Sequence, residues 1–489
     1  MSTKFYHLIN GERIGGNDWI VRRNPANTDE VVSEFPKGTY EIARSALEAA
    51  AAAFPAWATI PAPDRGDILF RAAELIGQQI EELTAIMTRE EGKTLAEARG
   101  EVVRARDIFR YYSAEGRRMS GETLPADKTD SILLTMREPL GVVSIITPWN
   151  FPMAIPAWKI GPALAAGCTI VFKPASLVPL CGLRLVEILH EAGLPPGVIN
   201  IVVGAGQDVG DEMVIHPVVR GISFTGSYGV GHAIQQKAAS NMTRTQLEMG
   251  GKNPLVVLDD ADLELAVKLA ASGGFGLTGQ ACTATSRVIV QRGILAQFSE
   301  QLVARARSII PGDGLRGGHM GPAVDESQLQ TDLEYIEIGR SEGAKLLVGG
   351  ARVQAETPGF YIQPTVFAEV HPSMRIAQEE IFGPVVGIIA VDDLDEAIDV
   401  ANNIEYGLSA GLVTTDLRSA FRFAERIEAG VVKVNQTTGG VAVQAPFGGV
   451  KKSSSNTFRE QGKTAIDFFS RSKSIYIDYP AGAAGEARP

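Results

Sequence analysis

The spacing of hydrophobic residues changes along the chain at about Gly141. From Tyr40 to about Gly116, apolar positions recur every three to four residues, which predicts long amphipathic helices. After Gly141, short runs rich in Val and Ile, such as VVSIITP and GISFTG, alternate with helical patterns near 155–166, 177–192, 207–215 and 229–240. Strands separated by helices of this length predict right-handed βαβ units and a parallel sheet.

The rest of the chain is β-rich or mixed. The first 40 residues predict short strands and turns, and a second α/β run extends from about Leu255 to Val450. The alternating pattern over residues 130–141 predicts an extended hairpin arm. The segment KSIYIDY, residues 473–479, predicts a lone strand outside both runs. Together with the 130–141 arm, this strand could extend a sheet between subunits.

Composition and charge narrow the functional classes. The chain has 489 residues, enough for two or three domains, and a formal net charge of −11. An acidic chain without basic runs argues against nucleic acid and anionic membranes as partners. The start lacks the apolar core of a signal peptide, and three cysteines, an odd number, predict no disulfide framework. We therefore expect a reducing, cytoplasmic location.

The most apolar region, residues 141–174, is expected to lie in a buried α/β core. Five prolines interrupt it and it contains Asn150 and Lys159, so it is poorly suited to span a membrane. A nucleotide would bind at the carboxyl ends of the parallel strands that this region begins.

Two glycine-rich turns between strand and helix are candidates to bind phosphate. VVGAGQDVG carries Gly206 and Gly210, and SFTGSYGVG carries Gly226 and Ser227. The amides at a helix N-terminus can hold a pyrophosphate. The first turn is one residue too long for the Rossmann fingerprint. Glycine is common at any such turn, so each signal is weak alone.

The stretch TGQACTATSR, residues 278–287, places Cys282 among small residues that leave room for a substrate. A thiolate is a strong nucleophile, so a catalytic cysteine is one interpretation. The alternative is a buried filler, because cysteine is among the most buried residue types. Cys168 and Cys181 lie in apolar strand and helix patterns and are expected in the core.

Two further polar residues could take part in chemistry. Glu248, in LEMGGKNP, precedes two glycines, where a backbone can approach a ligand closely. An apolar, glycine-rich setting raises the pKa of a carboxyl group, as suits a general base, and the alternative is a solvated surface glutamate. Asn150, in TPWNFP, could donate to a developing oxyanion or be an ordinary turn residue.

Taken together, these motifs resemble one family. From about residue 5 to 478 the chain is similar to the NAD(P)-dependent aldehyde dehydrogenases, in the ordered motifs PWNFP, FKPAS, FTGS, LEMGGKNP, GQACTATSR, EEIFGPV and PFGG. The resemblance implies a dimer or tetramer. It also implies an α/β fold with a Rossmann-type cofactor domain (1–128 and 142–254), an α/β catalytic domain (255–452), and a β oligomerisation arm and tail (129–141 and 453–489).

The resemblance also implies roles for single residues. Cys282 would be the nucleophile that forms a thiohemiacetal and then a thioester, and Glu248 the base that activates water to hydrolyse it. Asn150 and the backbone amide of Cys282 would form the oxyanion hole, with Lys159 among the catalytic residues. Substrate contacts are expected at Phe151, Trp158, Arg104 and Phe447, and no metal ligand. Cofactor contacts are expected at Thr147, Pro148, Trp149, Lys173, Ala175, Ser176, Gly206, Gly210, Phe224, Thr225, Gly226, Ser227, Gly250, Glu380 and Phe382.

Departures from the family pattern bear on specificity. Ser176 is expected to cap the helix near 177–192, and it stands where the family usually has a glutamate; without that charge, NADP should be used at least as well as NAD. The run KKSSSNTFREQG is similar to that of bacterial α-ketoglutarate semialdehyde dehydrogenases. Arg104, on a helix that borders the substrate tunnel in the family, could bind a substrate carboxylate, although most helix arginines are solvated.

The expected reaction is the NAD(P)-dependent oxidation of an aldehyde to a carboxylic acid. A carboxylated semialdehyde, such as α-ketoglutarate semialdehyde or succinic semialdehyde, is the favoured substrate, and a broad-specificity aliphatic or aromatic aldehyde dehydrogenase is the alternative. A CoA-acylating enzyme would not need Glu248, and a non-catalytic binding protein would need neither Glu248 nor Cys282. Both readings are therefore less favoured.

Overall fold

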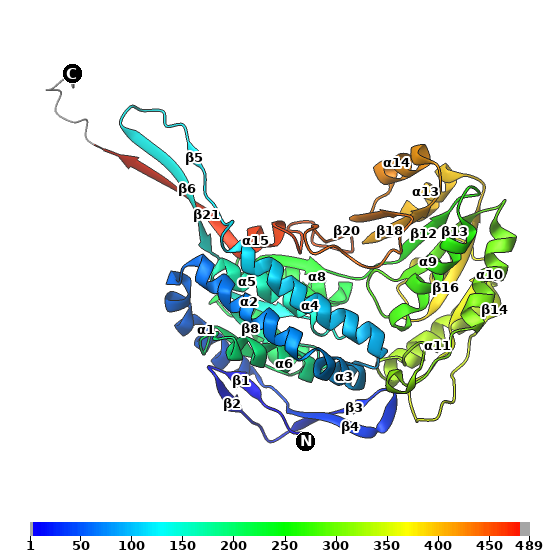
Figure 1. Cartoon of the computed structure of the whole chain (residues 1–489), viewed down its shortest axis with the longest axis horizontal. Helices are drawn as coiled ribbons and strands as arrows, with labels where there is room; N and C mark the ends of the chain where they lie inside the picture. The colour runs from blue at the N-terminus through cyan, green and yellow to red at the C-terminus, as the bar shows by residue number, and fades with distance from the viewer. Residues whose placement is uncertain (1–2, 480–489) are drawn as a thin grey trace.

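The computed structural model describes residues 3–479 and contains two α/β bodies, with a β arm projecting from the first (Figure 1). The first body holds a seven-stranded sheet in the order β11-β10-β7-β8-β9-β1-β2. Strands β7 to β11 pair in parallel, so the predicted parallel sheet is confirmed. Its strands are β1 (His7–Ile9), β2 (Glu12–Ile14), β7 (Val142–Ile146), β8 (Thr169–Lys173), β9 (Ile199–Ile201), β10 (Val219–Thr225) and β11 (Arg244–Glu248).

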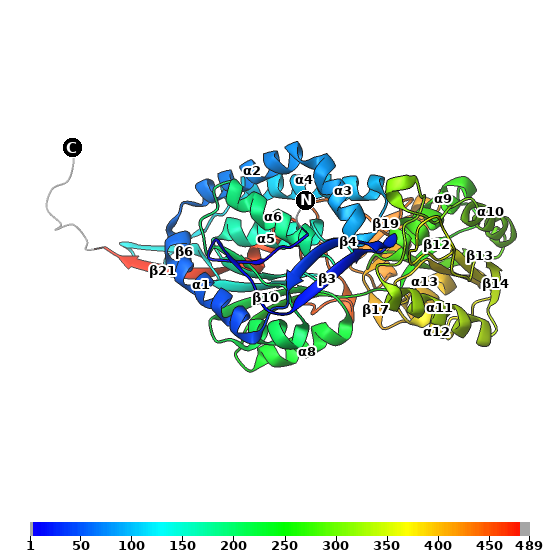
Figure 2. The ribbon, with the colours of Figure 1, turned by 90° about the horizontal axis from the view of Figure 1, so that it is seen from below.

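Helices cover both faces of this sheet, and Figure 2 shows α2 and α6 on one side and α8 on the other. In β8, Ile170 and Phe172 pack with α2, α4, α5 and α6, whereas Val171 packs with α1, α7 and α8. A strand buried on both faces is apolar throughout, which explains its unbroken hydrophobic pattern. The helices are α1 (Tyr40–Thr59), α2 (Ala62–Gln78), α3 (Ile80–Glu91), α4 (Leu95–Glu115), α5 (Ala154–Ala166), α6 (Pro179–Glu191), α7 (Asp211–Ile215) and α8 (Tyr228–Ala239).

The second body holds another seven-stranded sheet, in the order β14-β15-β16-β13-β12-β18-β19. All its neighbours pair in parallel except β14 with β15. Its strands are β12 (Asn253–Val257), β13 (Thr285–Gln291), β14 (Lys345–Val348), β15 (Thr365–Ala368), β16 (Val385–Val391), β18 (Ser409–Val413) and β19 (Val431–Val434). The helices around it are α9 (Leu263–Phe275), α10 (Leu295–Arg307), α11 (Glu326–Ser341), α12 (Arg375–Gln378), α13 (Leu394–Asn402) and α14 (Leu417–Arg426).

The arm is a three-stranded sheet of β5 (Thr123–Leu124), β6 (Ser131–Pro139) and β21 (Ser470–Asp478), the last preceded by α15 (Thr464–Phe469). The C-terminal strand predicted outside both α/β runs lies in this arm beside the 130–141 segment, because β21 pairs antiparallel with β6 along its whole length. Residues 480–489 of the predicted tail lie outside the described residues. Two smaller ribbons pair β3 (Trp19–Asn24) with β4 (Asn27–Pro36), and β17 (Tyr406–Gly407) with β20 (Val450–Lys451).

The start of α6 differs from the prediction for Ser176. The helix begins at Pro179, and its N-cap is Val178 with no side-chain cap bond. Ser176 precedes the cap, and its hydroxyl donates to the Gly204 carbonyl (3.2 Å). The buried carboxylate of Glu90 instead accepts from the amides of Leu180 and Cys181, both at 2.8 Å. A distant acidic side chain therefore satisfies the free amides that a local serine was expected to cap.

The most apolar stretch forms the buried helix α5, as predicted. All 13 residues of Ala154–Ala166 are buried. No helix within residues 3–479 is long and apolar enough to cross a bilayer. The boundaries of the predicted cofactor, catalytic and arm regions stay a prediction, because the sheets do not by themselves assign the connecting loops.

Candidate active site

The loop that carries Cys282 has a constrained backbone. It follows α9 through the turn Gly276–Gly279, in which Leu277 and Thr278 adopt left-handed φ values of 53° and 57°. Such values are rare for residues with a side chain and cluster at functional sites. The side-chain amide of Asn253 donates to the Cys282 carbonyl (2.8 Å), which anchors the loop on β12. The nucleophile candidate therefore lies on a rigid turn between α9 and β13.

Two cavities meet at Cys282. The larger, of about 390 Å³, is lined by all four predicted substrate residues, Arg104, Phe151, Trp158 and Phe447. The smaller, of about 290 Å³, is lined by residues that follow β7, β10 and β11 and by the segment 380–382. Within the described part of the chain, Cys282 is the one residue that lines both. Its thiol is free and partly exposed, unlike the buried thiols of Cys168 and Cys181.

Asn150 lies beside this thiol, at the edge of the smaller cavity. It is buried, and its side-chain amide donates to the Gln280 carbonyl, two residues before Cys282 (2.9 Å). An amide nitrogen carries two N–H groups. One of them is used to join Asn150 to the cysteine loop, which leaves the second to donate to an oxygen bonded to the reacting carbon.

Glu248 ends β11 and is buried, which rules out the solvated surface alternative. The Gly449 amide donates to one carboxylate oxygen (3.1 Å) and the Ser454 hydroxyl to the other (3.0 Å). Burial and the nearby Glu460 raise the pKa of Glu248 well above its ordinary value. Glu248 is not among the residues that line either cavity, but its carboxyl group is near enough to Cys282 to contribute to the raised pKa of the thiol.

A buried ion pair lies next to Glu248. Lys159, on α5, contacts Glu460 and donates to the Ser223 hydroxyl (3.0 Å), and both charged side chains are inaccessible. Burial raises the pKa of Glu460, although Lys159 opposes the shift. Sequence analysis identified Lys159 but missed Glu460 and Ser454. Both belong to KKSSSNTFREQG, so the signal was present as an unusual polar run.

The surroundings keep the Cys282 thiol protonated when the site is empty. Burial raises its pKa to about 12, and the carboxyl groups of Glu380, Glu248 and Glu460 add to the shift. A thiol with such a pKa needs a base, or a positive charge placed next to it, before it can attack.

The smaller cavity has the shape and polarity of a nucleotide site. A Cβ on Gly250 would lie 2.0 Å from a Glu380 carboxylate oxygen, so glycine at this position lets the Glu380 side chain keep its place. Glu380 accepts from the Gly251 amide (3.0 Å), and its pKa is raised to about 7, mainly by burial. Phe382 has a left-handed φ of 63°, and its ring packs edge to face against the ring of Trp149, with 5.4 Å between the ring centroids. These aromatic walls and the carboxylate fit the ring and ribose of a nicotinamide nucleotide.

The structure brings eight of the predicted cofactor residues to this cavity: Pro148, Trp149, Thr225, Gly226, Ser227, Gly250, Glu380 and Phe382. Sequence analysis missed Gln328 and Thr331, which enter the same cavity from α11. Their motif, DESQLQTD, has an ordinary helical appearance, so nothing in it distinguishes them.

The other predicted cofactor residues do not line this cavity. Lys173 is buried, and burial lowers its pKa to about 8. Phe224 is buried in the core of the first body. Gly206 and Gly210 face open space. The full set outside the cavity is Thr147, Lys173, Ala175, Ser176, Gly206, Gly210 and Phe224.

Arg104 lies on α4 in the wall of the larger cavity. Its neighbours Arg106 and Arg110 form ion pairs, with Asp107 at 2.8 Å and with Glu74 at 2.7 Å. Among residues 3–479, Arg104 has no carboxylate within ion-pair distance, and its guanidinium donates only weakly to Gln461 (3.4 Å). The Arg104 guanidinium therefore lies beside the larger cavity with N–H groups free to bind an anion.

Comparison with known proteins agrees with this geometry. The model of the aldehyde dehydrogenase family matches residues 15–475. The chain is 48% identical to the alpha-ketoglutarate semialdehyde dehydrogenase of Haloferax volcanii, covering 98% of this chain and 100% of that protein. It is 45% identical to the alpha-ketoglutaric semialdehyde dehydrogenase of Bacillus subtilis, covering 97% and 98%. The betaine aldehyde dehydrogenase of Staphylococcus aureus, solved with NAD+, superposes with a TM-score of 0.94 at 36% identity, covering 99% of this chain and 96% of that chain.

The chain belongs to the aldehyde dehydrogenase family. It is an oxidoreductase that oxidises aldehydes with NAD(P). The predicted family and the predicted α/β fold are both confirmed.

The electrostatics of Cys282 yield a test. Because the Glu380 carboxylate raises the pKa of the thiol, Glu380→Gln should lower that pKa and increase the thiolate fraction. We expect Cys282 of the cofactor-free enzyme to react roughly three- to tenfold faster with iodoacetamide at pH 8, where Glu380 is ionised. Mass spectrometry of the Cys282 peptide measures the rate.

The neighbouring Glu379 provides the matched control. It forms an exposed ion pair with Arg375 at 2.9 Å, so Glu379→Gln should leave the alkylation rate unchanged. Equal rates in the Glu380→Gln variant and the parent would contradict the assigned charge effect.

Proposed function

We propose that the enzyme oxidises a carboxylated semialdehyde, α-ketoglutarate semialdehyde or succinic semialdehyde, to the corresponding acid. The observation that carries the proposal is that Cys282 lines both cavities, so one thiol can reach a substrate from one side and a nucleotide from the other. The names of the two relatives, at 45% and 48% identity, support the substrate class.

The chemistry follows from the residues around the thiol. Cys282 loses its proton to solvent, and its sulfur bonds to the aldehyde carbon while the carbonyl electrons move to oxygen. The Asn150 amide and the Cys282 backbone N–H stabilise that oxyanion. NAD(P)+ supplies the hydride acceptor, and loss of hydride from the carbon leaves a thioester on Cys282. Glu248 then removes a proton from water, whose oxygen attacks the thioester, and the C–S bond breaks to release the acid.

The ion pair of Lys159 and Glu460 sets the charge behind Glu248. One basic group, Lys159, and two acidic groups, Glu460 and Glu248, therefore lie close together in a buried space. Burial, and after it the like-charge repulsion by Glu460, raise the pKa of Glu248 above its ordinary value, as suits a group that accepts and releases a proton.

Arg104 supplies the preference for a carboxylated substrate. A guanidinium binds a carboxylate with two parallel hydrogen bonds, and Arg104 has no competing carboxylate partner among the described residues. The rest of the substrate would lie along Phe151, Trp158 and Phe447, which suit an aliphatic chain. This arrangement favours a semialdehyde acid over the broad-specificity alternative.

The exposed arm supports a dimer or tetramer. Ile132, Met136, Tyr476 and Ile477 on β6 and β21 are exposed, although such residues are usually buried. A second copy of the chain would cover them. The three free thiols agree with the proposed reducing, cytoplasmic location.

The role of Glu248 leads to a kinetic prediction. Glu248→Gln keeps the shape but cannot accept a proton from water, so deacylation should fall by about a hundredfold or more. We expect a stoichiometric burst of NAD(P)H followed by slow turnover. A full steady-state rate would contradict the role, and Cys282→Ala, which should give neither burst nor turnover, serves as the control.

Substrate specificity is tested at Arg104. Arg104→Ala should raise KM for succinic semialdehyde by roughly tenfold or more, the effect of losing a charge-assisted pair, and should leave KM for hexanal unchanged. Arg106→Ala, on the same helix but paired with Asp107, is the matched control and should change neither. Equal effects of Arg104→Ala on both aldehydes would refute the proposed carboxylate contact.

Cofactor choice is tested at Ser176. We propose that NADP is used at least as well as NAD, because a short neutral side chain neither crowds nor repels a 2′-phosphate. Ser176→Glu should lower kcat/KM for NADP far more than for NAD, by roughly tenfold or more. Ser176→Ala, which removes only the bond to Gly204, separates the added charge from the lost hydrogen bond. A parent that strongly prefers NAD, with no effect of Ser176→Glu, would contradict the proposal.

A further inference from the structure

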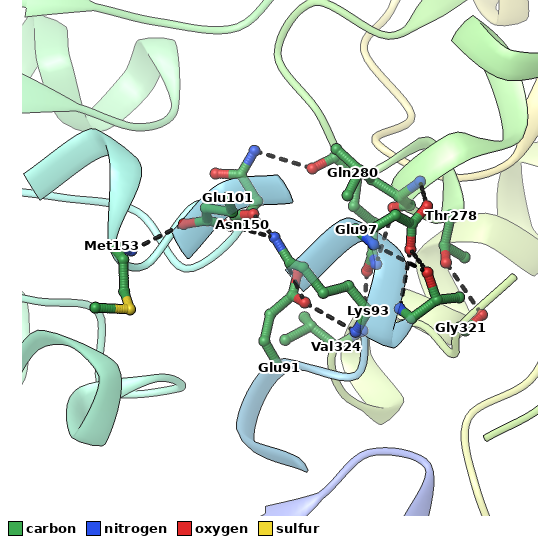
Figure 3. Close-up of polar contacts among 12 residues, drawn as sticks. Glu91, Lys93, Glu97, Glu101, Asn150, Met153, Thr278, Gln280, Gly321 and Val324 are labelled. Carbon is green, nitrogen blue, oxygen red and sulfur yellow. Dashed lines mark hydrogen bonds and ion pairs between the residues drawn. The ribbon is translucent and has the colours of Figure 1, made fainter. Parts of the chain in front are cut away.

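A fully buried lysine contacts the loop from Asn150 to Ala154 but does not line either cavity. Lys93 stands between α3 and α4, with 1% of its side chain exposed. Its ammonium donates to Glu101 (2.6 Å) and to the backbone carbonyl of Asn150 (2.8 Å), and it lies 4.8 Å from the Phe151 ring (Figure 3). Lys93 is absent from the walls of both cavities. It therefore acts on the site only through the groups that it holds.

Glu101 holds the other end of the same loop. One carboxylate oxygen pairs with Lys93, and the other accepts from the amides of Met153 (2.9 Å) and Ala154 (3.0 Å) at the start of α5. The loop from Asn150 to Ala154 is thus fixed at both ends by one buried ion pair. Removal of either charge would leave the other buried without a partner, which is costly.

The same helix also holds the turn before Cys282. Glu97 lies one helical turn before Glu101 on α4 and accepts from the Leu277 amide (2.7 Å). In Figure 3, Glu97 lies beside Thr278, the residue that follows Leu277. Gln280 accepts from the Val324 amide (2.9 Å) through its side chain and from the Asn150 amide through its backbone. The first turns of α4 therefore fix the position of the Asn150 loop relative to the cysteine loop.

The electrostatics keep Lys93 charged. Burial alone would lower its pKa, but Glu101 and Glu91 more than offset the effect and raise it. The acidic groups around the ammonium are Glu91 at 3.8 Å, Glu97 and Glu101. Burial raises the pKa of Glu91 to about 7, so it is partly neutral at physiological pH while Lys93 and Glu101 stay paired.

We propose that Lys93 is a positioning residue for the oxyanion amide of Asn150: it holds the Asn150 backbone so that the free side-chain N–H points to the oxygen on the carbon attacked by Cys282. This inference rests on the oxyanion role of Asn150 in the proposed function. Oxyanion donors act through exact placement, so a small displacement of the loop lowers the rate without changing which groups are present.

A double-mutant cycle tests the proposal. The variants are Lys93→Met, Asn150→Ala and the double substitution, and the readout is the single-turnover burst of NADPH with succinic semialdehyde, together with the NADP+ dissociation constant. Asn150→Ala should lower the burst rate about a hundredfold. Lys93→Met should lower the burst rate roughly tenfold or more and leave the cofactor affinity unchanged. When Asn150 is already Ala, adding Lys93→Met should lower the burst rate by at most about twofold further.

A purely structural role would give a different result. If the losses from Lys93→Met and Asn150→Ala multiply in the double variant, or if Lys93→Met leaves the burst unchanged, the inference is overturned. If Asn150→Ala itself leaves the burst unchanged, the oxyanion role in the proposed function fails instead. Arg99→Met, which breaks an exposed pair between Arg99 on α4 and Glu81 on α3, is the matched control and should retain the parent burst rate.

A second variant keeps the test decisive if Lys93→Met does not fold. Glu101→Gln retains an oxygen for the amides of Met153 and Ala154 but weakens the attraction that holds Lys93. It should lower the burst rate and show the same lack of additivity with Asn150→Ala. Multiplied losses in this second cycle would overturn the inference.

Discussion

The site depends on a close backbone contact between the cysteine loop and the segment that carries Glu380 and Phe382. Gly279, with a φ of 69°, packs so tightly that a Cβ would lie 2.2 Å from the Gly383 carbonyl oxygen. Only glycine combines this conformation with this approach. The contact places Cys282 at the junction of the two cavities. Each cavity alone is an ordinary pocket, and the shared thiol makes them one reaction site.

Buried charge provides the second constraint. Two buried ammonium groups near the site are each paired with a carboxylate and also contact the backbone or a hydroxyl: Lys159 with Glu460 and Ser223, and Lys93 with Glu101 and Asn150. Such pairs contribute little net stability, but they penalise any other arrangement of the groups around them. The unpaired Glu248 is the exception, and its raised pKa follows from its surroundings. The protonated resting state of Cys282 also protects it, because oxidation begins from the thiolate.

Sequence predicted the features that local pattern encodes. Apolar runs gave the strands of the parallel sheet, and the motifs around Cys282, Glu248 and Asn150 identified residues that the fold brings to one place. The contacts that tune these residues were not predictable, because their partners lie far apart in the chain: Glu460 is 301 positions from Lys159, and Ser454 is 206 from Glu248. The prediction that Ser176 caps α6 was wrong for the same reason, because Glu90, far away in the sequence, accepts from the free amides of that helix. The register of β21 against β6 could not be assigned from the sequence, because it depends on tertiary structure.

The two cavities differ in the kind of selectivity that they can supply. An apolar wall such as Phe151, Trp158 and Phe447 distinguishes chain lengths weakly, by roughly 1–3 kcal/mol per methylene. A guanidinium with no carboxylate partner among residues 3–479 changes this, because an uncharged aldehyde leaves Arg104 as it was, whereas a carboxylated one would gain a charge-assisted pair. Strong preference therefore requires that the two ends of the substrate be held at a fixed separation, with the aldehyde carbon at Cys282 and the carboxylate at Arg104. That separation is set by α4, which carries Arg104 and, one turn earlier, the Glu101 that fixes the Asn150 loop. Under the proposed function, one helix therefore carries both the residue that would bind the substrate carboxylate and the residue that fixes the loop of the oxyanion amide.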